Sequence, residues 1–246
     1  MIKRIILMTQ FLTRIPIPIT LDVTEEDFGK GLAFAPLVGM LIGGLMAAVY
    51  YGASYITQGI FPAVAAVIFY AFITGGLHID GLGDTFDGLF SNRSRDRMLE
   101  IMRDSRVGTN AVITIVSVFL LNIACIDAIS KEAAFKAVFF MPAIGRLGSV
   151  CSAGMATYAR SGQGLGKAFI DICGINEIII GTMISLLAAF TLFNIKGFIF
   201  VGAAILFTYL FVKFVTSKIG GMTGDTCGAA CELNQTIFLV LMLVLK

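Results

Sequence analysis

The chain has 246 residues, of which 57% are hydrophobic and 14% are charged, and its formal net charge is +2. Soluble domains contain about 25% charged residues, whereas the mean hydropathy of this chain is +0.91. These values exclude an ordinary soluble domain and predict an integral membrane protein. The five cysteines form no C-x-x-C pair, and His78 is the only histidine, so neither a structural zinc site nor a disulfide framework is expected.

The N-terminal segment is predicted to lie along the membrane surface. Residues 3–15 mix apolar side chains with Lys3, Arg4 and Arg14. This stretch is too short and too charged to cross a bilayer, but it suits an amphipathic helix at the interface. Pro16 and Pro18 end it, and an acidic turn at 22–27 follows.

Seven apolar stretches are long enough to cross a bilayer. They cover about 32–56, 60–77, 109–128, 137–156, 175–193 and 197–215, and the last run begins before Gln235 and ends at Lys246. Gly39 and Gly43 form a G-x-x-x-G pair that favours close helix packing. The predicted fold class is all-α, a multi-pass membrane helical bundle of about seven transmembrane helices that forms a single domain over residues 1–246.

Arginines are concentrated in the segment between residues 90 and 107, which holds five of them. Met98, Ile101 and Met102 recur there at helical spacing, which is typical of an amphipathic helix at the interface. The alternative is a loop whose positive charges only mark the cytoplasmic side.

The lysines and arginines predict the orientation of the chain. With the N-terminus in the cytoplasm, Arg146 and Lys213 fall inside spans, and the other charges divide unequally. Twelve lie on one side (Lys3, Arg4, Arg14, Lys30, Arg93, Arg95, Arg97, Arg103, Arg106, Arg160, Lys167 and Lys218) and four on the other (Lys131, Lys136, Lys196 and Lys246). The positive-inside rule then predicts a cytoplasmic (inner) membrane protein whose interfacial segment 1–31 and polar segments 78–107, 157–174 and 216–234 are cytoplasmic.

Three aspartates stand in a glycine-rich stretch that interrupts this apolar sequence. On a helix, Asp80, Asp84 and Asp87 fall at i, i+4 and i+7 and share one face. Carboxylates at this spacing repel one another, and oxygen ligands suit a hard cation such as Mg²⁺. A solvated acidic helix start is the alternative, but glycines and apolar residues surround the aspartates, which favours a metal site.

Two further polar segments carry groups that suit phosphate chemistry. Residues 158–167 are glycine-rich and contain Arg160 and Lys167, which could hold phosphate, although a flexible connector has the same composition. In the segment 220–232, Asp225 and Glu232 lie at i and i+7, again on one helical face. Acidic residues at a membrane are a functional hypothesis by default, and together these segments predict metal-assisted transfer of a phosphorylated group.

The aspartate stretch also resembles a known family. Residues 78–88, His-Ile-Asp-Gly-Leu-Gly-Asp-Thr-Phe-Asp-Gly, look like the motif of adenosylcobinamide-GDP ribazoletransferases, the cobalamin (5′-phosphate) synthases of bacterial and archaeal membranes. Residues 11–16, 36–39, 102–109, 158–166 and 224–232 are similar to family segments in the same order. Ser161-Gly162-Gln163 departs from the pattern, because a proline and an acidic residue are expected after Arg160.

The resemblance implies the reaction and its participants. The cobinamide-phosphate group of adenosylcobinamide-GDP would be transferred to α-ribazole or its 5′-phosphate, with release of GMP and with Mg²⁺ as cofactor. Partners would be these substrates and the lipid bilayer, with no nucleic acid; a homo-oligomer and contacts with other cobamide-pathway enzymes are left open. The resemblance implies that Asp80, Asp84 and Asp87 are catalytic metal ligands. Further ligands, substrate-binding groups or the general base would be Asp104, Asp225 and Glu232. Phosphates would be bound by Arg103, Arg106 and Arg160, and His78 would act as a base or a hydrogen-bond partner.

Three other functions stay open on the sequence alone. A CDP-alcohol phosphotransferase also carries membrane-face aspartates, but Asp84 and Thr85 stand where its D-G-x-x-A-R opening requires other residues. A membrane prenyltransferase acting on a diphosphate would use two aspartate-rich motifs. A transporter would place acidic groups near the bilayer midplane and show inverted repeats.

Overall fold

The computed structural model describes residues 1–161 and 164–245, which fold almost entirely into helices. No strand is present among them, and Tyr158 and Met222 form an isolated parallel bridge. The elements are α1 (Ile2–Leu12), α2 (Glu25–Gly31), the 3-10 helix η1 (Leu32–Phe34), α3 (Ala35–Ile56), α4 (Phe61–Thr74), α5 (Leu77–Leu89), α6 (Arg95–Ile101), α7 (Thr109–Ala128), α8 (Lys131–Gly154), α9 (Leu165–Ile172), α10 (Ile175–Phe193), α11 (Lys196–Ile219) and α12 (Gly224–Val244).

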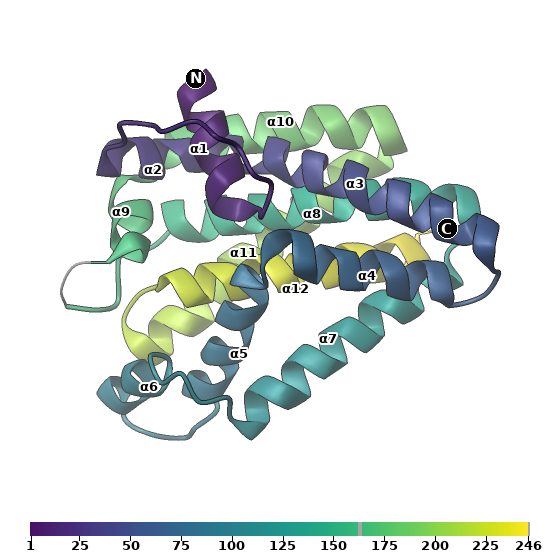
Figure 1. Cartoon of the computed structure of the whole chain (residues 1–246). Coiled ribbons are helices and arrows are strands. Elements are labelled where there is room, and N and C mark those ends of the chain that lie inside the picture. The colour runs from purple at the N-terminus through teal and green to yellow at the C-terminus, as the bar shows by residue number, and fades with distance from the viewer. Residues whose placement is uncertain (162–163, 246) are drawn as a thin grey trace.

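The predicted all-α membrane bundle is confirmed. Within residues 1–161 and 164–245, six helices are long and apolar enough to cross a membrane, and counting the bent pair of α4 and α5 as one span raises the number to seven. In Figure 1, α3, α4, α8 and α12 run side by side. The stretches predicted at 109–128 and 175–193 coincide with α7 and α10, because apolar side chains predominate along both helices.

Helix α8 forms the centre of the bundle and packs against α3, α10, α11 and α12. Its side chains are buried over most of its length, Arg146 included. The predicted close packing at Gly39 and Gly43 is confirmed, because a Cβ at either position would collide with the α8 backbone near Phe139 and Pro142. Small residues therefore let these two helices approach closely.

The second predicted span is shorter than expected. We predicted a stretch of about 60–77, but α4 ends at Thr74 because Gly75 and Gly76 adopt left-handed conformations, with φ of +62° and +71°. Glycine adopts such angles without a steric penalty. The chain turns by 91° at this point. The 14-residue α4, about 21 Å long at 1.5 Å per residue, is shorter than the roughly 30 Å hydrocarbon core of a bilayer, and α5 lies across the end of the bundle.

The surface helices gather at one end of the bundle. The amphipathic helices predicted at the N-terminus and in the arginine-rich segment are present as α1 and α6. Two helices were not predicted: α2, which Thr24 and Asp27 cap reciprocally, and α9, which occupies part of the segment 157–174. The rings of Phe11, Phe28 and Phe169 join α1, α2 and α9.

Candidate active site

Helix α5 carries the three aspartates and packs against the first turns of α12. The backbones approach so closely that a Cβ on Gly81 would lie 2.8 Å from the carbonyl oxygen of Asp225, and Gly228 of α12 lies against His78. The segment 216–234, predicted as a loop, is helical from Gly224 onward. This contact brings the two predicted acidic faces together at Asp225.

Asp84 lies at the centre of a carboxylate cluster, which we define as Asp80, Asp84, Asp87 and Asp225. Burial, followed by the negative charges of Asp80, Asp225 and Asp87, raises the pKa of Asp84 to about 7, and only Arg160 opposes this shift. Asp80 and Asp84 accept no side-chain hydrogen bond from residues 1–161 or 164–245. A cation would relieve this repulsion, so the residues fit a hard divalent ion.

Arg160 connects the cluster to the glycine-rich segment. Its Nη2 donates to Asp225 Oδ2 at 2.8 Å and to the Met102 carbonyl oxygen at 3.4 Å. Arg95, which sequence reasoning assigned no role, donates to the carbonyl oxygens of Ile219 and Ala159 at 2.9 and 2.8 Å. The three polar segments therefore meet at one end of the bundle, the left end in Figure 1.

Asp87 has a structural task in the cluster. Its two carboxylate oxygens accept hydrogen bonds from the backbone N–H groups of Gly108, at 2.6 Å, and Ala111, at 2.9 Å. These donors belong to the first turn of α7, where backbone N–H groups lack partners within the helix. Asp87 thus holds α7 against α5, and its role as a metal ligand stays a prediction.

A family model described as cobalamin-5-phosphate synthase matches residues 4–243. This chain belongs to that family. The adenosylcobinamide-GDP ribazoletransferase of Acetivibrio thermocellus is 51% identical over 249 residues, which cover 100% of this chain and 99% of the relative. The enzyme of the same name from Clostridium acetobutylicum is 49% identical, over 97% of this chain and 94% of the relative. No solved structure matches the chain.

Glu232 was predicted to face the aspartates, but in this synthase-family protein its surroundings differ from those of Asp225. It is seven residues beyond Asp225 on α12, about 10.5 Å along the helix axis. It is 1% exposed and accepts a 2.5 Å hydrogen bond from Tyr70 Oη. We call Tyr70, Arg146, Glu232 and Gln235 the buried network, because Arg146 and Gln235 donate to the same hydroxyl.

Among the described residues, one set of three potential ligand groups has all its ligand atoms within 4.8 Å of one another: His78, Cys231 and Glu232. This mixed nitrogen, sulfur and oxygen set does not suit Mg²⁺, which prefers oxygen ligands. Arg146 shares the Tyr70 hydroxyl with Glu232 and disfavours a second cation there. The carboxylate cluster is more open, as expected of a Mg²⁺ site completed by substrate phosphate oxygens and water.

The remaining predicted residues lie at the exposed end of α6. Arg106 forms an ion pair with Asp104 at 2.6 Å, and this partner lowers the pKa of Asp104 to about 2. A carboxylate with so low a pKa is a weak base, so the pairing argues against Asp104 as general base. Arg103 is exposed next to this pair and can meet phosphate arriving from solvent.

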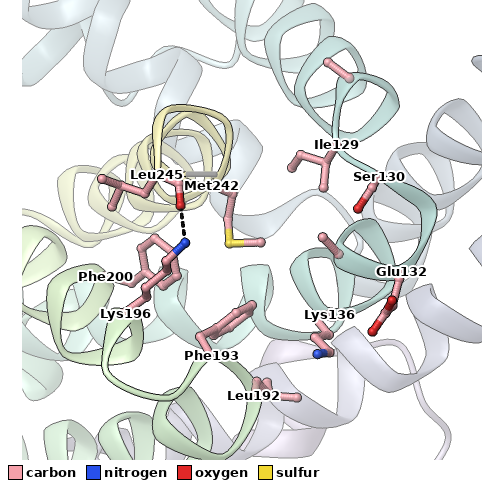
Figure 2. A pocket seen from close by; sticks show the side chains of 12 residues that line it. Ile129, Ser130, Glu132, Lys136, Leu192, Phe193, Lys196, Phe200, Met242 and Leu245 are labelled. Carbon is pink, nitrogen blue, oxygen red and sulfur yellow. Dashed lines mark hydrogen bonds between the residues drawn. The ribbon is translucent and has the colours of Figure 1, made fainter.

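A cavity of about 240 Å³ reaches inward from the carboxylate cluster. The exposed Asp80 and the half-buried Asp225 line it, as does Arg146, which is 0% exposed. A larger cavity, of about 700 Å³, lies among the connections at the opposite end (Figure 2). Lys196 there already donates to the Leu245 carbonyl oxygen at 2.6 Å. The smaller cavity is the candidate substrate site, because two members of the carboxylate cluster, Asp80 and Asp225, line it.

Proposed function

We propose that this chain is an adenosylcobinamide-GDP ribazoletransferase, which transfers the cobinamide-phosphate group to α-ribazole or its 5′-phosphate and releases GMP. The observation that carries the proposal is the carboxylate cluster, which combines elements from both halves of the chain and is flanked by Arg160. Membership of the synthase family and the names of its relatives support the same reaction.

The reaction exchanges one phosphate linkage for another. A ribose hydroxyl oxygen bonds to the phosphorus attached to cobinamide, the phosphoanhydride bond to GMP breaks, and the hydroxyl proton passes to a carboxylate. Asp80 and Asp84 are candidates to receive it, because their oxygens accept no side-chain hydrogen bond from the described residues. Positioning and neutralisation of charge account for most catalysis of this kind.

We further propose that Asp80, Asp84 and Asp225 hold Mg²⁺. When bound, the ion would neutralise charge on the diphosphate oxygens and on the leaving GMP. Arg160 keeps Asp225 in place through its 2.8 Å hydrogen bond. Arg103 and Arg106 would attract the phosphates toward the cluster from solvent.

We also propose that the cluster lies on the cytoplasmic side of the inner membrane. The twelve-to-four division of positive charges over the connections supports this orientation. Single cysteines that replace Ser91 and Ser161, in a chain without its native cysteines, should react with a membrane-impermeant maleimide only from the cytoplasmic side. Labelling from the opposite side would contradict the orientation.

The decisive test is GMP release from adenosylcobinamide-GDP by the purified protein in lipid nanodiscs. Release should require both Mg²⁺ and α-ribazole or its 5′-phosphate, with a cobamide as the second product. Asp84→Asn should lower turnover about 100-fold or more while the variant still folds, as its cooperative thermal unfolding would show. Activity with a CDP-alcohol or a prenyl diphosphate, without GMP release, would favour the rival functions instead.

A further inference from the structure

Arg146 is a buried charge with half of its hydrogen-bonding capacity unused. It is 0% exposed, in the centre of α8. Its Nη1 donates to Tyr70 Oη at 3.0 Å and, more weakly, to the Pro142 carbonyl oxygen at 3.5 Å. Its Nε and Nη2 have no hydrogen-bond partner among the described residues. Buried charged donors without partners are costly, so this edge calls for a ligand.

The buried network cannot supply that ligand. A tyrosine hydroxyl donates one hydrogen bond and accepts two. Tyr70 Oη donates to Glu232 and accepts from Arg146 and Gln235, the last at 2.8 Å. The hydroxyl is therefore saturated, and it links Arg146 to Glu232 only indirectly. Gln235 Oε1 of the network also lacks a partner among the described residues, but Arg146 donates only to Tyr70 and Pro142, so its Nε–Nη2 edge is left for a ligand from outside the network.

The cavity offers a place for such a partner. Arg146 lines it together with His78, whose Nδ1 is also buried without a partner among the described residues. Phe11, Leu12 and Phe169 contribute apolar walls. In such surroundings a hydrogen bond to a charged group is stronger than in water. Asp80 and Asp225 line the same cavity, so one ligand could contact Arg146 and these two carboxylates together.

We propose that the Nε–Nη2 edge of Arg146 binds a phosphate group of a substrate inside this cavity, inward of the carboxylate cluster. This inference rests on the proposed function, because the substrates of that reaction carry phosphates as their anionic groups. The planar guanidinium edge pairs with two oxygens of one anion, a geometry that lysine cannot reproduce. The phosphate comes either from the diphosphate of adenosylcobinamide-GDP or from the 5′-phosphate of the acceptor nucleotide.

The two sources are distinguished by kinetics of Arg146→Lys, which keeps the charge and removes the planar edge. If the edge binds the acceptor, KM for α-ribazole 5′-phosphate should rise about 10- to 100-fold, while KM for unphosphorylated α-ribazole stays within about twofold. If it binds the donor, KM for adenosylcobinamide-GDP should rise by that factor with either acceptor.

Tyr70→Phe is the matched comparison, because it removes the hydroxyl of the buried network and keeps Arg146. A purely structural Arg146 predicts that both variants lose unfolding temperature and kcat together, without a selective change in KM. That result would overturn the proposal. Wild-type GMP release tests the proposed function separately, since it does not depend on either substitution.

Calorimetry on the wild-type protein in EDTA covers the case in which Arg146→Lys fails to fold. Without divalent cations, the carboxylate cluster repels phosphates. Tighter binding of α-ribazole 5′-phosphate than of α-ribazole, or measurable binding of adenosylcobinamide-GDP, would support the Arg146 site if it persists in an Arg103→Gln/Arg106→Gln variant, which lacks the exposed phosphate-attracting arginines. Absence of both kinds of binding would overturn it.

Discussion

Asp225 and Glu232 occupy the same face of α12, yet their surroundings differ. Asp225 lies near other carboxylates and Arg160, at the end of the helix that meets solvent. Glu232 is buried, and it accepts a hydrogen bond from the tyrosine hydroxyl to which Arg146 donates. The comparison teaches that helical spacing predicts a shared face, whereas depth along the axis decides whether an acidic side chain lies beside other carboxylates or inside the buried network.

The largest expected effect is on catalysis, and it tests whether Asp225 belongs with Asp84. Each single Asn variant should lose about 100-fold or more in turnover. If the two carboxylates share a metal, the double variant should be scarcely worse than either single. Independent, multiplying losses in the GMP-release assay would separate Asp225 from the cluster.

Glu232 should act on stability more than on turnover. Glu232→Ala leaves the buried Tyr70 hydroxyl without its acceptor, and an unsatisfied buried donor costs about 1–3 kcal/mol. Thermal unfolding in detergent should detect this loss. Glu232→Gln, which can still accept from Tyr70, should lose less; equal stability of the Ala variant and the wild type would contradict the assigned role.

Gly81 tests the helix contact that brings Asp225 to the cluster. A Cβ at this position meets the Asp225 backbone at 2.8 Å, so Gly81→Ala should push α5 away and cost about 1–3 kcal/mol. The rate of GMP release should fall by more than the loss of stability, measured as unfolding temperature, would explain. Gly202→Ala is the control, because its Cβ meets nothing within 4 Å; equal behaviour of the two variants would show that the contact is unimportant.

The smallest effect concerns pH. The pKa of Asp84 is raised to about 7 in the folded chain, from an ordinary value of 3.8. The folded state therefore holds this proton more tightly than the unfolded state, and its contribution to stability falls as pH rises from about 4 through 7. In EDTA the unfolding temperature should decline across this window. Mg²⁺ should stabilise the protein more at pH 8 than at pH 5, and Asp84→Asn should weaken both trends.

The amino-acid sequence by itself determined the membrane bundle, most of its spans and the candidate residues of the carboxylate cluster. Apolar runs of sufficient length must form helices in a bilayer, because every backbone group has to be satisfied internally. This is why α7 and α10 were predicted at their observed ends. The spacing of Asp80 and Asp84 likewise follows from helical geometry alone.

The tertiary structure alone decided how these pieces are used. The 91° turn after α4 depends on two glycines whose left-handed angles are one of several conformations open to them. Glu232 contacts Tyr70 because α4 and α8 bring Tyr70 and Arg146 to its level on α12, and its role as a metal ligand stays a prediction. In the sequence, Arg146 was only a positive charge inside a predicted span. Its unpartnered Nε–Nη2 edge could not be predicted, because it depends on helices distant in sequence that enclose a cavity.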